Sequence, residues 1–133
     1  MKNIYFAGSI RGGRDDAKLY KQLIDELKTY GAVLTEHIGA KEVSFDLSDR
    51  HIHDRDLEWL SSSDILIAEV TTPSLGVGYE IGRAVSLEIP VVCLFRNRGD
   101  ALLSAMIAGS PAVQTFNYSD LEEAKEILGK VFS

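Results

Sequence analysis

The sequence is poor in cysteine and has no long hydrophobic run. Cys93 is the only cysteine among 133 residues, so no intrachain disulfide can form and no zinc-binding spacing is present. It lies in the apolar run 91–95, where a buried small side chain is expected rather than a reactive thiol. No apolar segment approaches the roughly 20 residues that cross a bilayer. The N-terminus runs directly into a predicted strand without a signal-peptide layout, so we expect a cytoplasmic protein without membrane association.

Positive charge is also scarce. The chain has 14 lysines and arginines against 20 aspartates and glutamates, a formal net charge of −6. Surfaces that follow nucleic-acid phosphates are basic, so this balance argues against nucleic acid as a partner. It still allows one small anionic ligand, held by a local cluster of donors. We expect no bound metal and no cofactor.

The periodicity of the chain predicts one α/β domain that covers residues 1–133. Hydrophobic residues make up 45% of the chain and charged residues 26%, which is typical of a globular protein. We expect strands at 3–7, 32–35, 65–70, 91–95 and 113–116, and helices at 15–30, 51–60, 78–87, 101–108 and 121–132. Residues 38–49 form a loop or a weak helix. Strict alternation predicts a three-layer Rossmann-like or flavodoxin-like domain with a five-stranded, mainly parallel sheet.

Sheets of this type bind ligands beyond the carboxyl ends of their strands. The loops at 8–14, 36–37, 71–80 and 96–104 should therefore line one crevice. The first of them, Gly8-Ser9-Ile10-Arg11-Gly12-Gly13-Arg14, has the glycines, hydroxyl and arginines of a phosphate-binding turn ahead of a helix. It matches neither the Walker pattern nor the dinucleotide fingerprint. The alternative is a surface turn with solvated arginines. Ser74 and Ser104 could add hydroxyl donors, although serine is common in loops.

A second glycine-rich segment, residues 74–84, joins the third strand to the next helix and carries Glu80. We expect Glu80 in the first helical turn, where it either complements the helix dipole or faces the crevice as a charged carboxylate. A partner carboxylate would suit glycosidic bond cleavage, with one group attacking the anomeric carbon and the other handling a proton. Asp56, beside the apolar side of helix 51–60, is a candidate. His51 and His53 do not share a helix face, and His37 is more simply a structural residue than a base.

Several segments of the sequence resemble the 2′-deoxynucleoside 5′-phosphate N-hydrolases, which belong to the wider nucleoside 2-deoxyribosyltransferase family. The similarity runs from residue 3 to about residue 110. Its blocks are Ile4-Tyr5-Phe6, the loop 8–14, Leu34-Thr35-Glu36-His37, Asp56-Leu57-Glu58-Trp59-Leu60, Ala68-Glu69-Val70-Thr71, Pro73-Ser74-Leu75-Gly76-Val77-Gly78-Tyr79-Glu80 and Leu103-Ser104-Ala105-Met106-Ile107.

The resemblance implies a homodimer with shared active sites that cleaves deoxynucleoside monophosphates into a base and 2-deoxyribose 5-phosphate. It implies that Glu80 is the nucleophile that forms a covalent intermediate, that Asp56 assists it or the proton transfer, and that Tyr5 orients Glu80. The implied substrate-binding residues are Gly8, Ser9, Ile10, Arg11, Gly12, Gly13, Arg14, Tyr20, His37, Ser74, Gly76 and Gly78, with Ser104, Ala105 and Met106 supplied by the partner subunit.

Three other functions fit the same crevice. A nucleoside 2-deoxyribosyltransferase would pass the sugar to a second base, but it prefers unphosphorylated substrates, and the phosphate-type loop argues against it. A ribonucleoside monophosphate N-hydrolase would share the architecture. A non-catalytic nucleotide-binding module would use the crevice for sensing, which the presence of both Glu80 and Asp56 disfavours.

Overall fold

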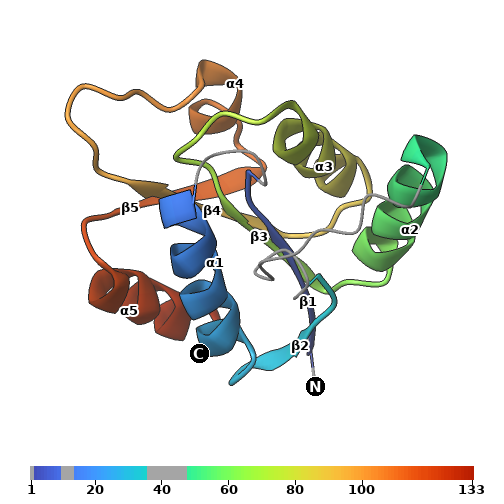
Figure 1. Cartoon of the computed structure of the whole chain (residues 1–133), viewed down its shortest axis with the longest axis horizontal. Helices are drawn as coiled ribbons and strands as arrows, with labels where there is room; N and C mark the ends of the chain where they lie inside the picture. Colours follow the sequence, from blue (N-terminus) through green and yellow to red (C-terminus); the bar gives the residue numbers. More distant parts are fainter. Residues whose placement is uncertain (1, 10–13, 36–47) are drawn as a thin grey trace.

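The computed structural model describes residues 2–9, 14–35 and 48–133, and for residues 14 and 15 only the backbone. A central sheet is covered on both faces by helices (Figure 1). The elements, in chain order, are β1 (Lys2–Ala7), α1 (Arg14–Leu27), β2 (Gly31–Val33), α2 (Asp49–Ser61), β3 (Ile65–Glu69), α3 (Leu75–Ser86), β4 (Val91–Arg96), α4 (Ala105–Ala108), β5 (Val113–Tyr118) and α5 (Leu121–Val131).

The sheet has five strands in the order β2-β1-β3-β4-β5, and every neighbouring pair is parallel. This confirms the predicted fold class. The chain leaves β1 toward β2 on one side and returns to place β3 on the other, so the direction of winding reverses between β1 and β3. In parallel sheets this reversal opens a crevice at the carboxyl ends of the two strands. A binding site is therefore expected beside the ends of β1 and β3.

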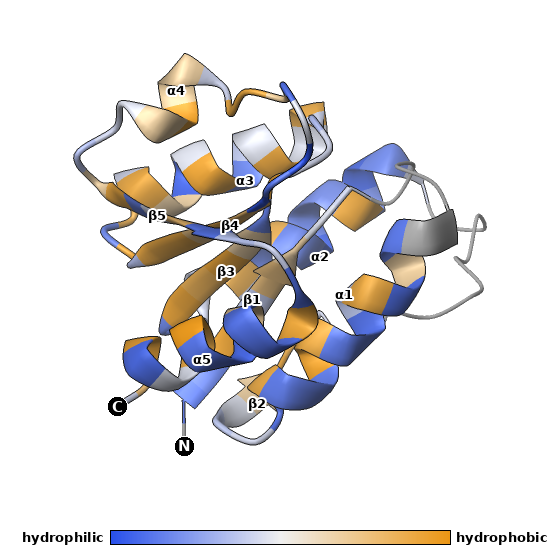
Figure 2. Ribbon diagram, turned by 90° about the vertical axis from the view of Figure 1, so that its left-hand side faces the viewer, coloured by the Kyte–Doolittle hydropathy of each residue, from blue (hydrophilic) through white to orange (hydrophobic). Residues whose placement is uncertain are grey.

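Strand β3 shows how the sequence pattern produces the layers. All five of its residues are buried, because its side chains alternate between two cores. Ile65 and Ile67 pack with α1 and α5 on one face. Leu66 and Ala68 pack with α2 and α3 on the other. Figure 2 shows apolar strands between helices, of which α1, α2 and α5 carry hydrophilic sides. Cys93 is buried in the second core, as predicted.

The starts of α3 and α4 differ most from the prediction, because serine side chains begin those helices. Helix α3 starts at Leu75 rather than at residue 78, since Ser74 Oγ accepts the N–H of Val77 at 3.3 Å. Helix α4 covers only residues 105–108 rather than 101–108, and Ser104 Oγ caps it by accepting the N–H of Met106. Glycines at 76 and 78 suggested a longer loop, but an N-cap overrides their weak helix propensity.

No helix within the described ranges is long and apolar enough to cross a membrane.

Candidate active site

The three residues predicted to be catalytic come together between α2, α3 and β1. Tyr5 belongs to the core on the α2 and α3 face. Glu80 is half-buried and lies close enough to Tyr5 and Asp56 for both to change its pKa. Burial raises the pKa of the Glu80 carboxyl from its ordinary value of 4.5 to about 7, the Tyr5 hydroxyl partly opposes this, and the charge of Asp56 adds to it. The carboxyl is therefore close to half ionised at neutral pH.

The expected helix-dipole stabilisation of Glu80 is wrong. Because α3 begins at Leu75, Glu80 lies beyond the first turn, and that turn contains no acidic residue. The dipole effect falls off within one turn, whereas burial acts directly on the charged form. Burial therefore decides the protonation of Glu80. A carboxyl whose pKa lies near the working pH can give up its proton and then attack.

Tyr5 has a buried hydroxyl without an established hydrogen bond. Its side chain is 0% exposed, and among the described residues no partner meets its Oη in hydrogen-bonding geometry. Burial, and then the charge of Glu80, nevertheless raise its pKa well above the ordinary value. The Tyr5 hydroxyl and the Glu80 carboxyl are therefore close neighbours. Catalytic hydrogen bonds are often long before substrate binds, and an unpaired buried hydroxyl requires a reason of this kind.

Arg55 holds the second carboxylate, a role that the sequence analysis missed. Its Nε donates to Asp56 Oδ1 at 3.1 Å, and its Nη2 lies 3.1 Å from the same oxygen. Adjacent helical residues do not usually face each other. Here the guanidinium lies 4.7 Å from the centre of the Trp59 ring, and this stacking turns it toward Asp56. The sequence signal was an arginine four residues before a tryptophan, the spacing of one helix face.

The start of the predicted phosphate loop packs tightly on α1. Ser9 is buried, and its N–H donates to Tyr20 Oη at 3.1 Å. A Cβ on Gly8 would lie 2.9 Å from the Tyr20 ring, so glycine is required there. Tyr20 is 3% exposed, and burial, followed by the charges of Glu69 and Asp16, raises its pKa to about 12. The neutral phenol of Tyr20 therefore holds the start of the loop against α1.

Some predicted residues lie outside the described part of the chain. They are Ile10, Arg11, Gly12, Gly13 and His37. Arg14 is the first residue of α1, and only its backbone is described.

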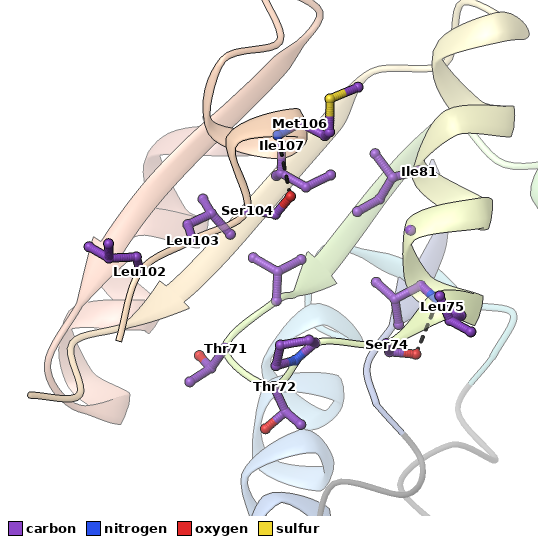
Figure 3. Close-up of a pocket in the computed structure, with 14 residues that line it drawn as sticks. Thr71, Thr72, Ser74, Leu75, Ile81, Leu102, Leu103, Ser104, Met106 and Ile107 are labelled. Atoms are coloured by element: carbon purple, nitrogen blue, oxygen red, sulfur yellow. Dashed lines mark hydrogen bonds between the residues drawn. The ribbon is translucent and has the colours of Figure 1, made fainter. Parts of the chain in front are cut away.

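A pocket of about 410 Å³ lies between α3 and α4 and is distinct from the carboxylate cluster (Figure 3). Ser74, Gly78, Ile81, Ser104 and Met106 of the same chain contribute to its wall. Tyr5, Asp56 and Glu80 do not line it. Ile81 lines the pocket, whereas its neighbour Glu80 lies close to Tyr5 and Asp56. Gly76 and Ala105, predicted to bind substrate, do not line this pocket; Ala105 borders a shallower pocket beside β4 and β5.

The pocket is open and apolar at its rim. Leu75, Leu102 and Met106 are 97%, 91% and 82% exposed. A Cβ on Gly78 would meet nothing within 4 Å, and one on Gly76 only Ser74 Oγ at 3.8 Å. Packing among the described residues therefore does not require these glycines, and within that part of the chain their outer side has room for a ligand or a second subunit.

Comparison with known proteins identifies the family of this chain. The sequence pattern of the nucleoside 2-deoxyribosyltransferase family matches residues 4–124. A 5-hydroxymethyl-dUMP N-hydrolase of Tetraodon nigroviridis is 48% identical over 137 residues, which cover 98% of this chain and 96% of that protein. The human 5-hydroxymethyl-dUMP N-hydrolase is 48% identical over 127 residues, covering 92% of this chain and 73% of that protein.

Solved structures share the fold at low sequence identity. A conserved protein of Enterococcus faecalis has a TM-score of 0.77 at 21% identity, and covers 98% of this chain and 99% of that one. The CMP N-glycosidase of Clostridium botulinum has a TM-score of 0.71 at 16% identity, with the same coverage. The family pattern and the relatives at 48% identity confirm the resemblance inferred from the sequence.

Proposed function

Because this chain belongs to the nucleoside 2-deoxyribosyltransferase family, we propose that it hydrolyses the N-glycosidic bond of 2′-deoxynucleoside 5′-monophosphates. The products are a free base and 2-deoxyribose 5-phosphate. Nearly half of its residues are identical to those of 5-hydroxymethyl-dUMP N-hydrolases along almost the whole chain. The observation that carries the proposal is the meeting of Glu80 and Asp56 with Tyr5, where the Glu80 pKa is about 7.

The proposed reaction has two steps. Ionised Glu80 attacks C1′, the bond from C1′ to the base nitrogen breaks, and its electron pair leaves with the base, which takes up a proton with the help of Asp56. Water then attacks C1′, the bond to the Glu80 oxygen breaks and its electron pair returns to the Glu80 carboxylate. One proton of the water passes back to Asp56, and the other stays on the new sugar hydroxyl. Two carboxyl groups around one anomeric carbon are the usual arrangement for such a retaining mechanism.

The charge of the transition state gives a reason for two carboxyl groups in the site. Loss of the base leaves positive charge on the sugar, and nearby fixed negative charge stabilises it. A deoxysugar lacks the electron-withdrawing 2′-hydroxyl, so the cation forms more readily than in a ribonucleotide. The remaining tasks are to position the sugar and to protonate the base. Tyr5 serves the first by orienting Glu80, and Arg55 serves the second by fixing Asp56 Oδ1.

The 5′-phosphate gives binding energy remote from the reacting bond, which can be used to place C1′. In the proposal it is held by residues that follow β1 and β3: Ser9, Arg11, Gly12, Gly13 and Ser74. A second subunit adds Ser104 to the phosphate site and places Met106 near the sugar or base. The exposed apolar side chains around the α3 and α4 pocket support that assembly, because rims of this kind mark protein contacts. A charged mononucleotide does not cross membranes freely, which favours a cytoplasmic location.

A substrate panel tests the proposal. Purified protein is incubated with deoxynucleoside monophosphates, including 5-hydroxymethyl-dUMP, and separately with ribonucleoside monophosphates and deoxynucleosides, with and without an acceptor base. Chromatography follows the released bases. Free base from deoxynucleoside monophosphates alone is the expected result. Base exchange would instead identify a transferase, and release from ribonucleotides a ribonucleotide hydrolase. No turnover on any substrate would indicate a non-catalytic nucleotide-binding module.

A further inference from the structure

The sheet face opposite Tyr5 and Glu80 contains a buried polar network at the carboxyl ends of the strands. Glu69, the last residue of β3, is 2% exposed. Its two carboxylate oxygens accept hydrogen bonds from the N–H and the hydroxyl of Thr71, at 2.7 and 2.9 Å, and from the Tyr118 hydroxyl of β5. These hydrogen bonds fix the first residues after β3.

A second buried carboxylate extends the network to α1 and β4. The Asp16 side chain is 7% exposed. Its Oδ1 accepts from Arg96 Nη2 at 3.1 Å, and its Oδ2 accepts from Thr72 Oγ1 at 3.1 Å. The main-chain N–H of Arg96 in turn donates to Thr71 Oγ1 at 2.8 Å. The side chain of Asp16 in α1 and the main chain of Arg96 in β4 therefore bind the two threonines of the loop between β3 and α3.

This network joins the two segments that the proposed function uses for the 5′-phosphate. Thr72 precedes Ser74 by two residues. Asp16 lies one helical turn before Tyr20, whose hydroxyl accepts the Ser9 N–H at 3.1 Å. Helix α1 therefore contacts Ser9 through Tyr20 and the β3 to α3 loop through Asp16, and it sets the spacing of the two serines.

Fold stability alone is a weak reason for this arrangement. A buried ion pair contributes little net stability, since the desolvation of the charges offsets their attraction. Buried polar groups that are fully hydrogen-bonded do fix one geometry. Positioning errors near 1 Å are enough to weaken binding and catalysis. A site that binds a phosphate through two loops needs a fixed distance between those loops.

We propose that Thr72, Asp16 and Arg96 are positioning residues for the 5′-phosphate, because together they fix the distance between Ser9 at the end of β1 and Ser74 at the start of α3. The inference rests on the proposed function for the identity of the ligand. None of the three needs to touch the phosphate, so their effect should appear in phosphate binding rather than in the bond-breaking step.

The test uses the full chain with Thr72→Val, which keeps the shape of the side chain and removes its hydroxyl. Thr72→Ser restores the hydroxyl. Thr29→Val is the matched control, because Thr29 Oγ1 donates to Glu26 O at 2.7 Å at the far end of α1. The measurements are the Kd for 2-deoxyribose 5-phosphate by calorimetry, and KM and kcat for a deoxynucleoside monophosphate.

We expect Thr72→Val to weaken 2-deoxyribose 5-phosphate binding and raise KM about tenfold, the usual effect of losing one hydrogen bond to a charged group. We expect kcat to stay within about threefold, because only ground-state positioning of the phosphate is altered. Thr72→Ser should bind as the wild type does, and Thr29→Val should change nothing. Unchanged binding in Thr72→Val, or a loss confined to kcat, would overturn the inference.

Two further outcomes separate this inference from the proposed function. Hydrolysis by the wild type together with unchanged binding in Thr72→Val refutes only the positioning role. Binding of 2-deoxyribose 5-phosphate by the wild type without hydrolysis refutes only the proposed activity. If Thr72→Val does not fold, Arg96→Lys replaces it, since lysine keeps the charge but cannot reproduce the guanidinium geometry at Asp16; wild-type binding in that variant would contradict the inference.

Discussion

Replacing Glu80 by glutamine should stabilise the folded protein, and the gain should grow with pH. Glutamine imitates the neutral carboxyl, and burial in the folded state favours that neutral form. In the unfolded chain Glu80 ionises near its ordinary pKa of 4.5, whereas in the folded chain it keeps its proton up to about pH 7. Between these values the folded state binds more protons, so raising the pH favours unfolding of the wild type.

The size of the effect follows from the two pKa values. At about 1.4 kcal/mol for each tenfold change in proton affinity, the difference between 4.5 and about 7 amounts to about 3 kcal/mol. Below pH 4.5 both states hold the proton and the two proteins should be nearly equal in stability. Above pH 7 the full difference applies, and for a domain of this length it corresponds to about 10 °C in Tm.

The assay is urea unfolding of wild type and Glu80→Gln at pH 4.5, 6 and 8. Glu122→Gln is the control for the loss of one carboxylate, because the Glu122 side chain is 81% exposed. A stability gain of equal size at pH 4.5 and pH 8 would refute the raised pKa. Unfolding tests this more cleanly than activity does, because the phosphate of the substrate also titrates, near pH 6. The same variant should bind nucleotide and lose turnover by orders of magnitude; near-normal activity would refute the nucleophile.

Three other substitutions test the remaining roles. Tyr5→Phe should leave the unfolding free energy unchanged or raise it by about 1 kcal/mol, because it removes an unpaired buried hydroxyl, and should lower kcat at least tenfold; a less stable but fully active variant would contradict this. Arg55→Met should release Asp56 and lower kcat about tenfold. Arg50→Met, at a side chain 91% exposed, should leave kcat unchanged. Equal effects of the two substitutions on kcat would refute the role of Arg55 in holding Asp56. Ser104→Ala should raise KM with little change in kcat, and light scattering of the wild type should show a dimer; a fully active monomer would exclude a shared site.

The fold was predictable because the residue pattern within each short segment indicates whether that segment is a strand or a helix. The run Ile65 to Ala68 is apolar at every position, which indicates a strand covered on both faces, and the alternation of strands with helices indicates a parallel sheet. Helix starts were less predictable, since Ser74 begins α3 through one hydroxyl-to-backbone contact. The glycines that follow it indicated a longer loop. That error moved Glu80 into the wrong turn and reversed the expected direction of its pKa.

The polar contacts around the site were not predictable from spacing. Asp16 and Arg96 lie 80 residues apart, and in the sequence each is indistinguishable from a solvated surface charge. The same holds for Glu69, which ends an apolar strand and is held by Thr71 and Tyr118. Resemblance to a family predicted the residues that the proposed function places near the reacting atoms. It did not identify those that hold them in place, because such contacts depend on the packing of elements distant in sequence.

The arrangement of Tyr5 and Glu80 is unfavourable without substrate, and this is consistent with the proposed reaction. A buried hydroxyl lacks a partner in hydrogen-bonding geometry within the described residues, and a carboxyl is held close to half protonated by burial. Positive charge developing on the sugar would favour the ionised carboxylate, which in turn is a better acceptor for the Tyr5 hydroxyl. Both unfavourable features would then be relieved together as the glycosidic bond breaks. Interactions that improve only in the transition state lower the barrier, whereas those already satisfied in the free protein do not.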